Sequence, residues 1–183
     1  MKGNTRLIKV IHNVIATLIG IVLFVALTRV EIFIPGVKNI SLQPRMAVTA
    51  FFTALFGPVS GVLIAFFGHL LGDYLYYEKL WWSWIIPEII IGVGIGAFYK
   101  KYHVHEGEFT GRNIVFFNTV QVIANAITWI FVAPILSIII DRELPNLVFL
   151  QGTIAFLGDT IVMGTLGTVL LYTYSKVRKE TMV

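Results

Sequence analysis

Long apolar stretches separated by short polar ones dominate the chain. Because a helix needs about 20 apolar residues to cross a bilayer core, the pattern predicts a small number of membrane helices. Gly57 and Pro58 divide two of them, since proline cannot continue a helix that precedes it. The chain is therefore expected to be an all-α integral membrane protein, a bundle of six transmembrane helices in a single membrane domain over residues 1–183. The six predicted segments are approximately 10–30, 45–56, 58–77, 82–99, 114–140 and 151–175.

Two of these segments have unusual lengths. The second, 45–56, is too short to span a bilayer alone, so its neighbours must shield it from lipid. The fifth, 114–140, is long enough to tilt or to project from the bilayer, and Pro134 is expected to kink it.

The composition supports a membrane protein. Of 183 residues, 57% are hydrophobic and 13% are charged, with a mean hydropathy of +0.83. Ordinary soluble domains contain about 45–50% apolar residues, so the excess is expected to face lipid. The chain has no cysteine, which excludes disulfides, thiolate nucleophiles and cysteine metal sites. The first apolar run is longer than the core of a signal peptide and is interpreted as a retained helix.

Charge predicts the orientation of the bundle. Six helices place both termini on one side, with nine Lys and Arg residues there and five on the other side. Cytoplasmic loops carry the excess of basic residues, so both termini are predicted to be cytoplasmic. Trp81, Trp82 and Trp84 then lie at the outer interface. An aromatic belt would explain at least one or two of them, and a ligand site the rest.

Four ionisable residues fall inside the apolar segments: His69, Asp73, Glu88 and Asp159. Such groups are costly in a membrane and point to function by default. On the predicted topology all four lie in the outer half, with Asp159 about two turns below the start of its helix. Asp159, Glu88 and His69 could serve as acid–base groups of an intramembrane enzyme, but the chain has no cysteine and no paired-aspartate or His-Glu-x-x-His motif. A ligand site in the outer half is favoured.

The fifth segment carries a polar stripe. Its members recur at spacings of three, four and three residues: Asn118, Gln121, Asn125 and Thr128. They share one helix face. The stripe is either a hydrogen-bond seam between helices or part of a ligand site, and Asn125 and Thr128 are the better candidates for ligand contact.

Small residues form a second pattern. Ala16 and Gly20 make a small-xxx-small pair in the first segment, and small residues repeat along the third segment. Such stripes permit close helix contact, either within the bundle or with a partner. The polar loop 101–113 contains His103 and His105 but no convincing ligand set, so it is interpreted as a solvated loop without a metal.

Together these features resemble a known family. The features that carry the resemblance are the Ala16/Gly20 pair, an "IPG" loop, a short helix joined through Gly-Pro to "GPVSGVLIAFFGHLLGD", an outer "WWSW" and a polar fifth helix. With these features the chain resembles the substrate-binding S components of energy-coupling factor (ECF) vitamin transporters. The resemblance covers nearly the whole chain. The stretch "GHLLGDYLYYEKLWWSW" resembles a branch that includes cobalamin-specific members.

The resemblance implies a function. An S component of this family binds a vitamin near the extracellular side and docks on a membrane coupling subunit of the EcfT type, which carries two cytoplasmic ATPase subunits. It implies that Ala16 and Gly20 dock the coupling subunit and that loop 31–44 acts as a lid. The residues then expected to bind substrate are His69, Asp73, Trp81, Trp82, Trp84, Glu88, Asn125, Thr128 and Asp159.

The transported ligand favoured by the resemblance is cobalamin, recognised by aromatic and amide groups, with another vitamin or precursor as the alternative. The chain has no nucleotide-binding loop, so ATP hydrolysis is expected in partner subunits and not here. No intrinsic cofactor, metal or nucleic-acid partner is expected. The predicted location is the plasma membrane of a bacterium, with lipid around the helices.

Overall fold

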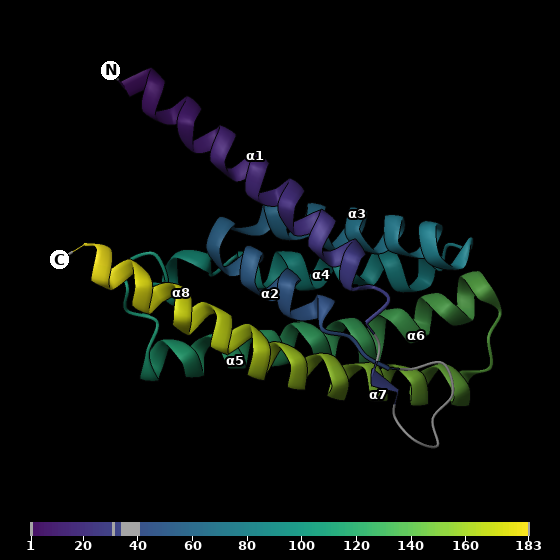
Figure 1. Cartoon of the computed structure of the whole chain (residues 1–183). Helices are drawn as coiled ribbons and strands as arrows, with labels where there is room; N and C mark the ends of the chain where they lie inside the picture. The colour runs from purple at the N-terminus through teal and green to yellow at the C-terminus, as the bar shows by residue number, and fades with distance from the viewer. Residues whose placement is uncertain (1, 31, 34–40, 183) are drawn as a thin grey trace.

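The computed structural model describes residues 2–30, 32–33 and 41–182, and over these residues the protein is a helical bundle (Figure 1). The first four helices are α1 (Lys2–Leu27), α2 (Arg45–Phe56), α3 (Pro58–Tyr77) and α4 (Trp82–Gly96). A short antiparallel ribbon, β1 (Ile32–Phe33) and β2 (Ser41–Leu42), lies between α1 and α2, and the 3₁₀ turn η1 (Tyr99–Tyr102) follows α4.

Two long helices complete the bundle. One is continuous from 111 to 141 and consists of α5 (Gly111–Asn125), η2 (Ala126–Val132), α6 (Ala133–Leu136) and η3 (Ser137–Asp141). The other is continuous from 145 to 181 and consists of α7 (Pro145–Val162), η4 (Met163–Gly167) and α8 (Thr168–Thr181). Four of the helices are long and apolar enough to cross a membrane, and α2 and α4 are shorter apolar helices. The prediction of an all-α membrane protein is confirmed.

The helix boundaries differ from the predicted ones where polar residues are helical. The last helix begins at Pro145, not near 151, and continues to Thr181, beyond 175. Proline suits the first turn of a helix, where its missing N–H is not needed, and the polar C-terminal turns remain helical outside the apolar stretch. Hydropathy detects the membrane-spanning part of a helix and not its polar ends.

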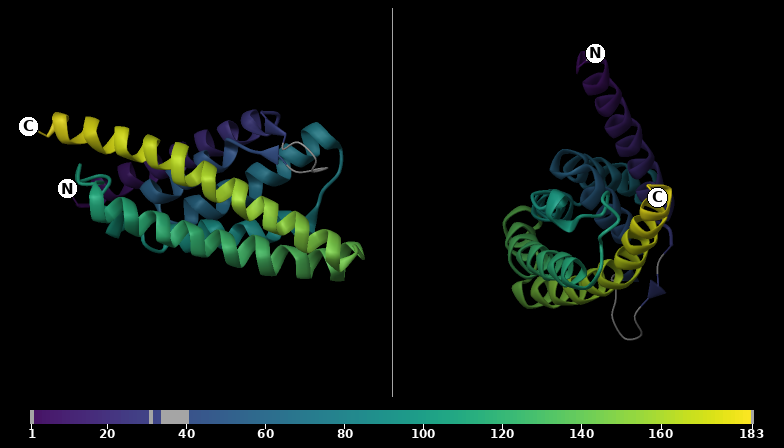
Figure 2. Two further views of the ribbon diagram at one scale, coloured as in Figure 1. Left: turned by 90° about the horizontal axis from the view of Figure 1, so that it is seen from below. Right: turned by 90° about the vertical axis from the view of Figure 1, so that its left-hand side faces the viewer.

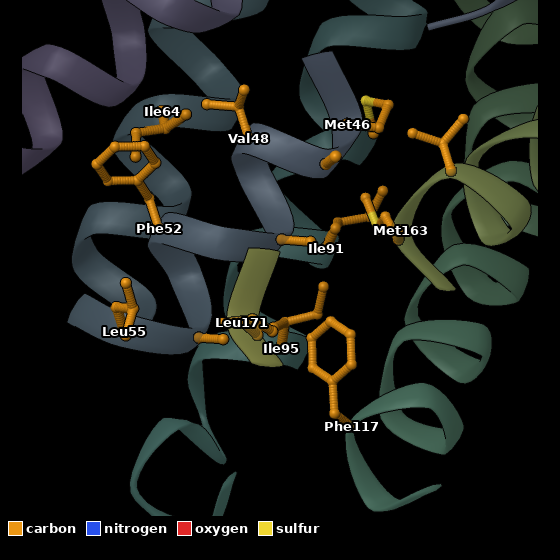
Figure 3. Packing of buried hydrophobic residues seen from close by; sticks show 14 of the residues in the cluster. Met46, Val48, Phe52, Leu55, Ile64, Ile91, Ile95, Phe117, Met163 and Leu171 are labelled. Carbon is orange, nitrogen blue, oxygen red and sulfur yellow. The ribbon is translucent and has the colours of Figure 1, made fainter. Parts of the chain in front are cut away.

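Helix α2 is the centre of the bundle. Ten of its twelve residues are buried, and it contacts α1, α3, α4 and η4. Figure 3 shows Met46, Val48, Phe52 and Leu55 of α2 among apolar side chains of its neighbours. The prediction that neighbouring helices shield this short helix is confirmed.

A sharp turn joins α2 to α3. Gly57 has φ = +88°, which favours glycine, and Pro58 begins α3. Helices α3 and α4 then pack very closely: a Cβ atom added at Gly92 would lie 2.6 Å from the carbonyl carbon of Gly61. The glycines of these two helices therefore set the spacing of their backbones.

Pi-helical turns flank Pro134, where a kink is expected from the sequence. The segments η2 and η3 lie on either side of α6, which contains Pro134 near its start. Because proline has no N–H to donate, the regular α-helical bonding pattern cannot pass through it. Pi-helical turns change the direction of side chains locally and are frequent at functional sites.

The two ends of the bundle differ. Helix α1 begins and α8 ends at the same end of the molecule, and the N-terminal half of α1 extends away from the other helices (Figures 1 and 2). The connections from α3 to α4 and from η3 to α7 lie at the opposite end (Figure 1). A cytoplasmic position of both termini stays a prediction.

The loop after η1 is less solvated than predicted. His105 is half-buried, its Nε2 lies 2.9 Å from the carbonyl oxygen of Leu55, and its ring packs against Phe56 and Tyr174. His103, by contrast, is exposed. Among the described residues, no group of three or more His, Cys, Asp or Glu side chains is placed to hold a metal ion.

Candidate functional site

A cavity of about 580 Å³ opens at the end of the bundle opposite to the start of α1. Side chains from α2, α3, α4, η2, η3 and α7 line it, together with residues of the connecting loops. The lining residues are Gln43, Arg45, Met46, His69, Asp73, Tyr77, Trp81, Trp84, Glu88, Trp129, Ser137, Asp141, Glu143, Val148, Gln151, Ala155 and Asp159. The volume is typical of a small-molecule site.

A histidine between two carboxylates forms one wall of the cavity. His69 and Asp73 lie one turn apart on α3, and Glu88 faces them from the antiparallel α4. His69 Nδ1 is hydrogen-bonded to Glu88 Oε2, and His69 Nε2 lies 3.5 Å from Asp73 Oδ1. All three side chains are buried, and Glu88 is 0% exposed. The sequence-predicted grouping of these residues is present in the structure.

Each of these carboxylates keeps one oxygen free. Glu88 Oε1 and Asp73 Oδ2 are buried and have no hydrogen-bond partner. An ionised carboxylate only accepts hydrogen bonds, and a buried acceptor without a donor is costly. A ligand with suitably placed donors would satisfy both oxygens.

Aromatic rings form another part of the cavity. The rings of Trp84 and Trp129 have centroids 5.5 Å apart and planes tilted by 31°. Nearer the helix ends, Trp81 packs edge-on against Tyr77, and the ammonium of Lys79 lies 5.1 Å from the centroid of the Trp81 ring. A flat ring system is the kind of ligand that such a surface accommodates.

Asp159 lies deeper than the sequence predicted. Because α7 begins at Pro145, Asp159 is fourteen residues into the helix, about 21 Å along its axis, and not two turns below its start. Its side chain is nevertheless one of the cavity-lining groups, and it is 7% exposed. The cavity therefore penetrates well into the bundle.

Three residues of the polar stripe, Asn118, Gln121 and Asn125, form a hydrogen-bond seam behind the cavity, whereas the Thr128 hydroxyl has no hydrogen-bond partner. Asn125 is fully buried and donates to Gln121 Oε1 over 3.1 Å, while Asn118 donates to Thr168 Oγ1 over 3.0 Å. Thr128 is also buried, and neither it nor Asn125 lines the cavity. The seam nevertheless reaches the cavity indirectly, because the Trp129 indole Nε1 donates to Asn125 Oδ1 over 3.1 Å.

The structure thus brings six of the nine predicted substrate-binding residues to the cavity: His69, Asp73, Trp81, Trp84, Glu88 and Asp159. Trp82 is 40% exposed and does not line the cavity, as suits an interfacial belt residue. For every one of these residues, contact with a ligand stays a prediction.

Sequence reasoning missed several lining residues. Arg45 is one of the five basic residues that the charge count places on the outer side, yet it is 7% exposed. Its guanidinium lies 4.8 Å from the ring centroid of Phe24, and its Nη1 lies 3.4 Å from Thr28 Oγ1. The sequence feature that could have identified Arg45 as a cavity residue is its position at the start of an otherwise apolar, shielded helix. Trp129 lies one residue beyond the recognised stripe, and a π-helical turn, which the sequence does not reveal, sets its direction.

Polar residues surround the opening. Asp141 and Glu143 are exposed and come from the connection between η3 and α7, and Ser83 Oγ donates a hydrogen bond to Asp141 Oδ2. The predicted lid, loop 31–44, lies largely outside the described residues. Within its described part, Gln43 lines the cavity.

Ala16 and Gly20 face the interior of the chain. Ala16 is 8% exposed, and a Cβ atom added at Gly20 would lie 2.5 Å from Ile64 Cδ1 and 3.3 Å from Phe52 Cγ. The small-xxx-small pair therefore supports packing of α1 on α3 and α2. Docking of a partner at these two residues stays a prediction. It would require α2 and α3 to move away from this face of α1.

Similar proteins are known. A family model described as "ECF-type riboflavin transporter, S component" matches residues 9–176. A UPF0397 protein of an Exiguobacterium species is 40% identical over 92% of this chain and 92% of its own length. UPF0397 proteins of Lacticaseibacillus casei and Staphylococcus aureus are 34% and 36% identical, over 93% and 94% of this chain and 92% and 95% of their own lengths.

No solved structure matches the chain. The family is one of transporter subunits, and such subunits work with a membrane coupling subunit and ATPase subunits. The relatives come from bacteria. Since the family model spans almost the entire helical bundle, the chain belongs to the family of ECF-type riboflavin transporter S components.

Proposed function

We propose that this chain is the substrate-specificity subunit of an ECF-type transporter in a bacterial plasma membrane and that it binds a vitamin or vitamin precursor in the cavity described above. The observation that carries the proposal is the position of the cavity. It lies at the end of the bundle opposite to the termini, with ionisable and aromatic side chains in its wall. Cytoplasmic termini would place its opening on the extracellular side, where a nutrient arrives.

Energy for uptake would come from other subunits. The chain carries no nucleotide-binding loop, so a membrane coupling subunit and two cytoplasmic ATPase subunits would complete the transporter. The long exposed apolar face of α1 is available to lipid or to the coupling subunit; its residues include Leu7, Ile11, Val14, Leu18 and Val22.

Cobalamin is one candidate substrate, favoured by the resemblance of residues 68–84 to cobalamin-specific members. The aromatic surface around Trp84 and Trp129 supports a flat ligand. The amides expected to meet the corrin rim support it less, because Asn125 is engaged in hydrogen bonds within the bundle. The family description names riboflavin, which makes riboflavin the second candidate.

Reconstitution tests the proposed function. The chain should assemble with a coupling subunit and ATPase subunits, and proteoliposomes containing the complex should accumulate a labelled vitamin when ATP is supplied on the ATPase side. Riboflavin, cobalamin and thiamine form the first panel. A complex with an inactive ATPase is the control. Failure of the chain to assemble, or ATP-independent accumulation, would refute the transporter assignment.

A further inference from the structure

The cavity wall has a strong excess of acidic groups. Five carboxylates line it: Asp73, Glu88, Asp141, Glu143 and Asp159. The opposing cations among the lining residues are Arg45 and, when protonated, His69. Three of the carboxylates are nine-tenths or more buried, with exposures of 2% for Asp73, 0% for Glu88 and 7% for Asp159.

Neighbouring buried carboxylates destabilise one another when they are ionised, unless positive charge compensates them. Arg45 supplies only part of that compensation, because it is a single fixed cation beside five carboxylates. His69 is engaged with Glu88 and Asp73 through both ring nitrogens. The protein's own side chains therefore leave acidic groups of the cavity without a matching cation.

Two free oxygen atoms show where a ligand would bind. Glu88 Oε1 and Asp73 Oδ2 are buried, lack hydrogen-bond partners and belong to residues of the cavity wall. As oxygens of ionised carboxylates, these atoms are satisfied by a group that donates hydrogen bonds, carries positive charge or does both. The two unpaired oxygens therefore favour a hydrogen-bond donor or a cation whatever the total number of acidic residues in the wall.

The aromatic part of the cavity wall also favours a cationic ring. Indole faces attract cations as well as flat rings, and Trp84 and Trp129 lie side by side in the same wall. A cavity of about 580 Å³ holds a compact ligand. Charge, free acceptors and aromatic surface all favour the same kind of molecule.

On the basis of the proposed function, we propose that the substrate is a compact, positively charged nitrogen heterocycle. Its cationic or N–H-bearing part binds near Glu88 and Asp73, and its ring packs on Trp84 and Trp129. This class differs from riboflavin, which is uncharged, and from cobalamin, which is much larger and presents a rim of amides.

Ligand titration of the purified full-length chain tests the substrate class. Thiamine is the probe, because it combines a permanently cationic ring with an aminopyrimidine, and its analogue with a neutral thiophene in place of the thiazolium is the matched control. Calorimetry and tryptophan fluorescence report binding. We expect thiamine to bind at least tenfold more tightly than the neutral analogue, riboflavin or cobalamin.

Charge-neutralising variants test the site. Glu88→Gln should weaken thiamine binding at least tenfold and should affect the neutral analogue much less. Asp159→Asn, which changes a carboxylate on another helix, should also weaken thiamine binding. It is the substitute variant if Glu88→Gln does not fold. Glu106→Gln removes an exposed carboxylate of the loop after η1 that does not line the cavity, and should leave binding unchanged.

The outcomes separate the two proposals. No thiamine binding at millimolar concentration, tighter binding of riboflavin or cobalamin, or equal binding of the charged and neutral probes would each overturn the cationic class. Each of these results is compatible with assembly and ATP-driven uptake of another vitamin. Failure to assemble with a coupling subunit would refute the transporter assignment and leave the measured charge preference of the cavity intact.

Discussion

Trp129 and Asn125 are joined by a hydrogen bond of 3.1 Å from the indole Nε1 to the amide oxygen. The bond links two regions that differ in environment, since Asn125 belongs to the buried seam and Trp129 lines the cavity. The seam therefore holds an aromatic wall residue in place without touching the cavity.

Replacing this amide should weaken ligand binding. In Asn125→Leu the Trp129 indole and Gln121 Oε1 each lose a partner, and a lost neutral hydrogen bond costs about 1 kcal/mol. We expect the affinity for the vitamin that binds in the panel to fall several-fold, measured by calorimetry. Asn118→Leu, in the same stripe but bonded to Thr168, is the control and should change affinity much less. Equal effects of the two substitutions would contradict a positioning role for Asn125.

The two tryptophans near the start of α4 should differ in their importance. Trp84 packs against Trp129 in the cavity wall, whereas Trp82 is 40% exposed and outside the wall. We expect Trp84→Ala to weaken vitamin binding at least tenfold, about 1.4 kcal/mol, and Trp82→Ala to leave it within twofold. Titrations of both variants in detergent measure this. A larger loss for Trp82→Ala would show that the ligand binds elsewhere.

His69 should be a stability determinant as well as a wall residue. His69→Leu removes the partner of the buried Glu88 and Asp73 carboxylates. Breaking a buried pair by removing one member costs about 3–5 kcal/mol, whereas replacing both members by apolar groups costs much less. We expect a lower melting temperature for His69→Leu than for His69→Leu combined with Glu88→Leu. The opposite order would show that the pair is not stabilising Glu88.

Gly20 should be needed for folding of the solitary chain. A leucine there would overlap Ile64, because even a Cβ atom lies 2.5 Å from Ile64 Cδ1, and overpacking of this kind costs about 1–3 kcal/mol. We expect Gly20→Leu to lower the melting temperature of the isolated chain, while Ile19→Leu, at an exposed neighbour, should not. An isolated Gly20→Leu chain of normal stability that fails in uptake would instead support docking of a partner at this face.

The contact between α3 and α4 should tolerate no Cβ atom at Gly92. An alanine Cβ would lie 2.6 Å from the Gly61 carbonyl carbon and from the Val62 nitrogen, and backbone atoms cannot rotate away. We expect Gly92→Ala to separate the helices and to lower the melting temperature strongly. Gly158→Ala is the control, because its Cβ would meet only the end of the flexible Leu42 side chain at 2.8 Å. Similar stability of both variants would contradict a backbone contact at Gly92.

The helices themselves were predictable from the sequence. Apolar runs, the Gly57–Pro58 break and the shortness of 45–56 are local features, and each corresponds to an observed helix or turn. The ends of the helices were less predictable, because residues such as Pro145 and those of the polar tail of α8 extend a helix without adding hydropathy.

The sequence by itself determined the fold class and the ionisable residues that carry a cost in a membrane, including the pairing of His69 and Asp73 on one helix face. Only the tertiary structure decided which of these residues share a cavity. The three amides of the polar stripe form hydrogen bonds within the bundle, whereas Arg45 and Trp129 reach the cavity wall. The reason is physical: hydropathy and helical period fix which face of a helix is polar, but helix packing and π-helical turns fix what that face meets.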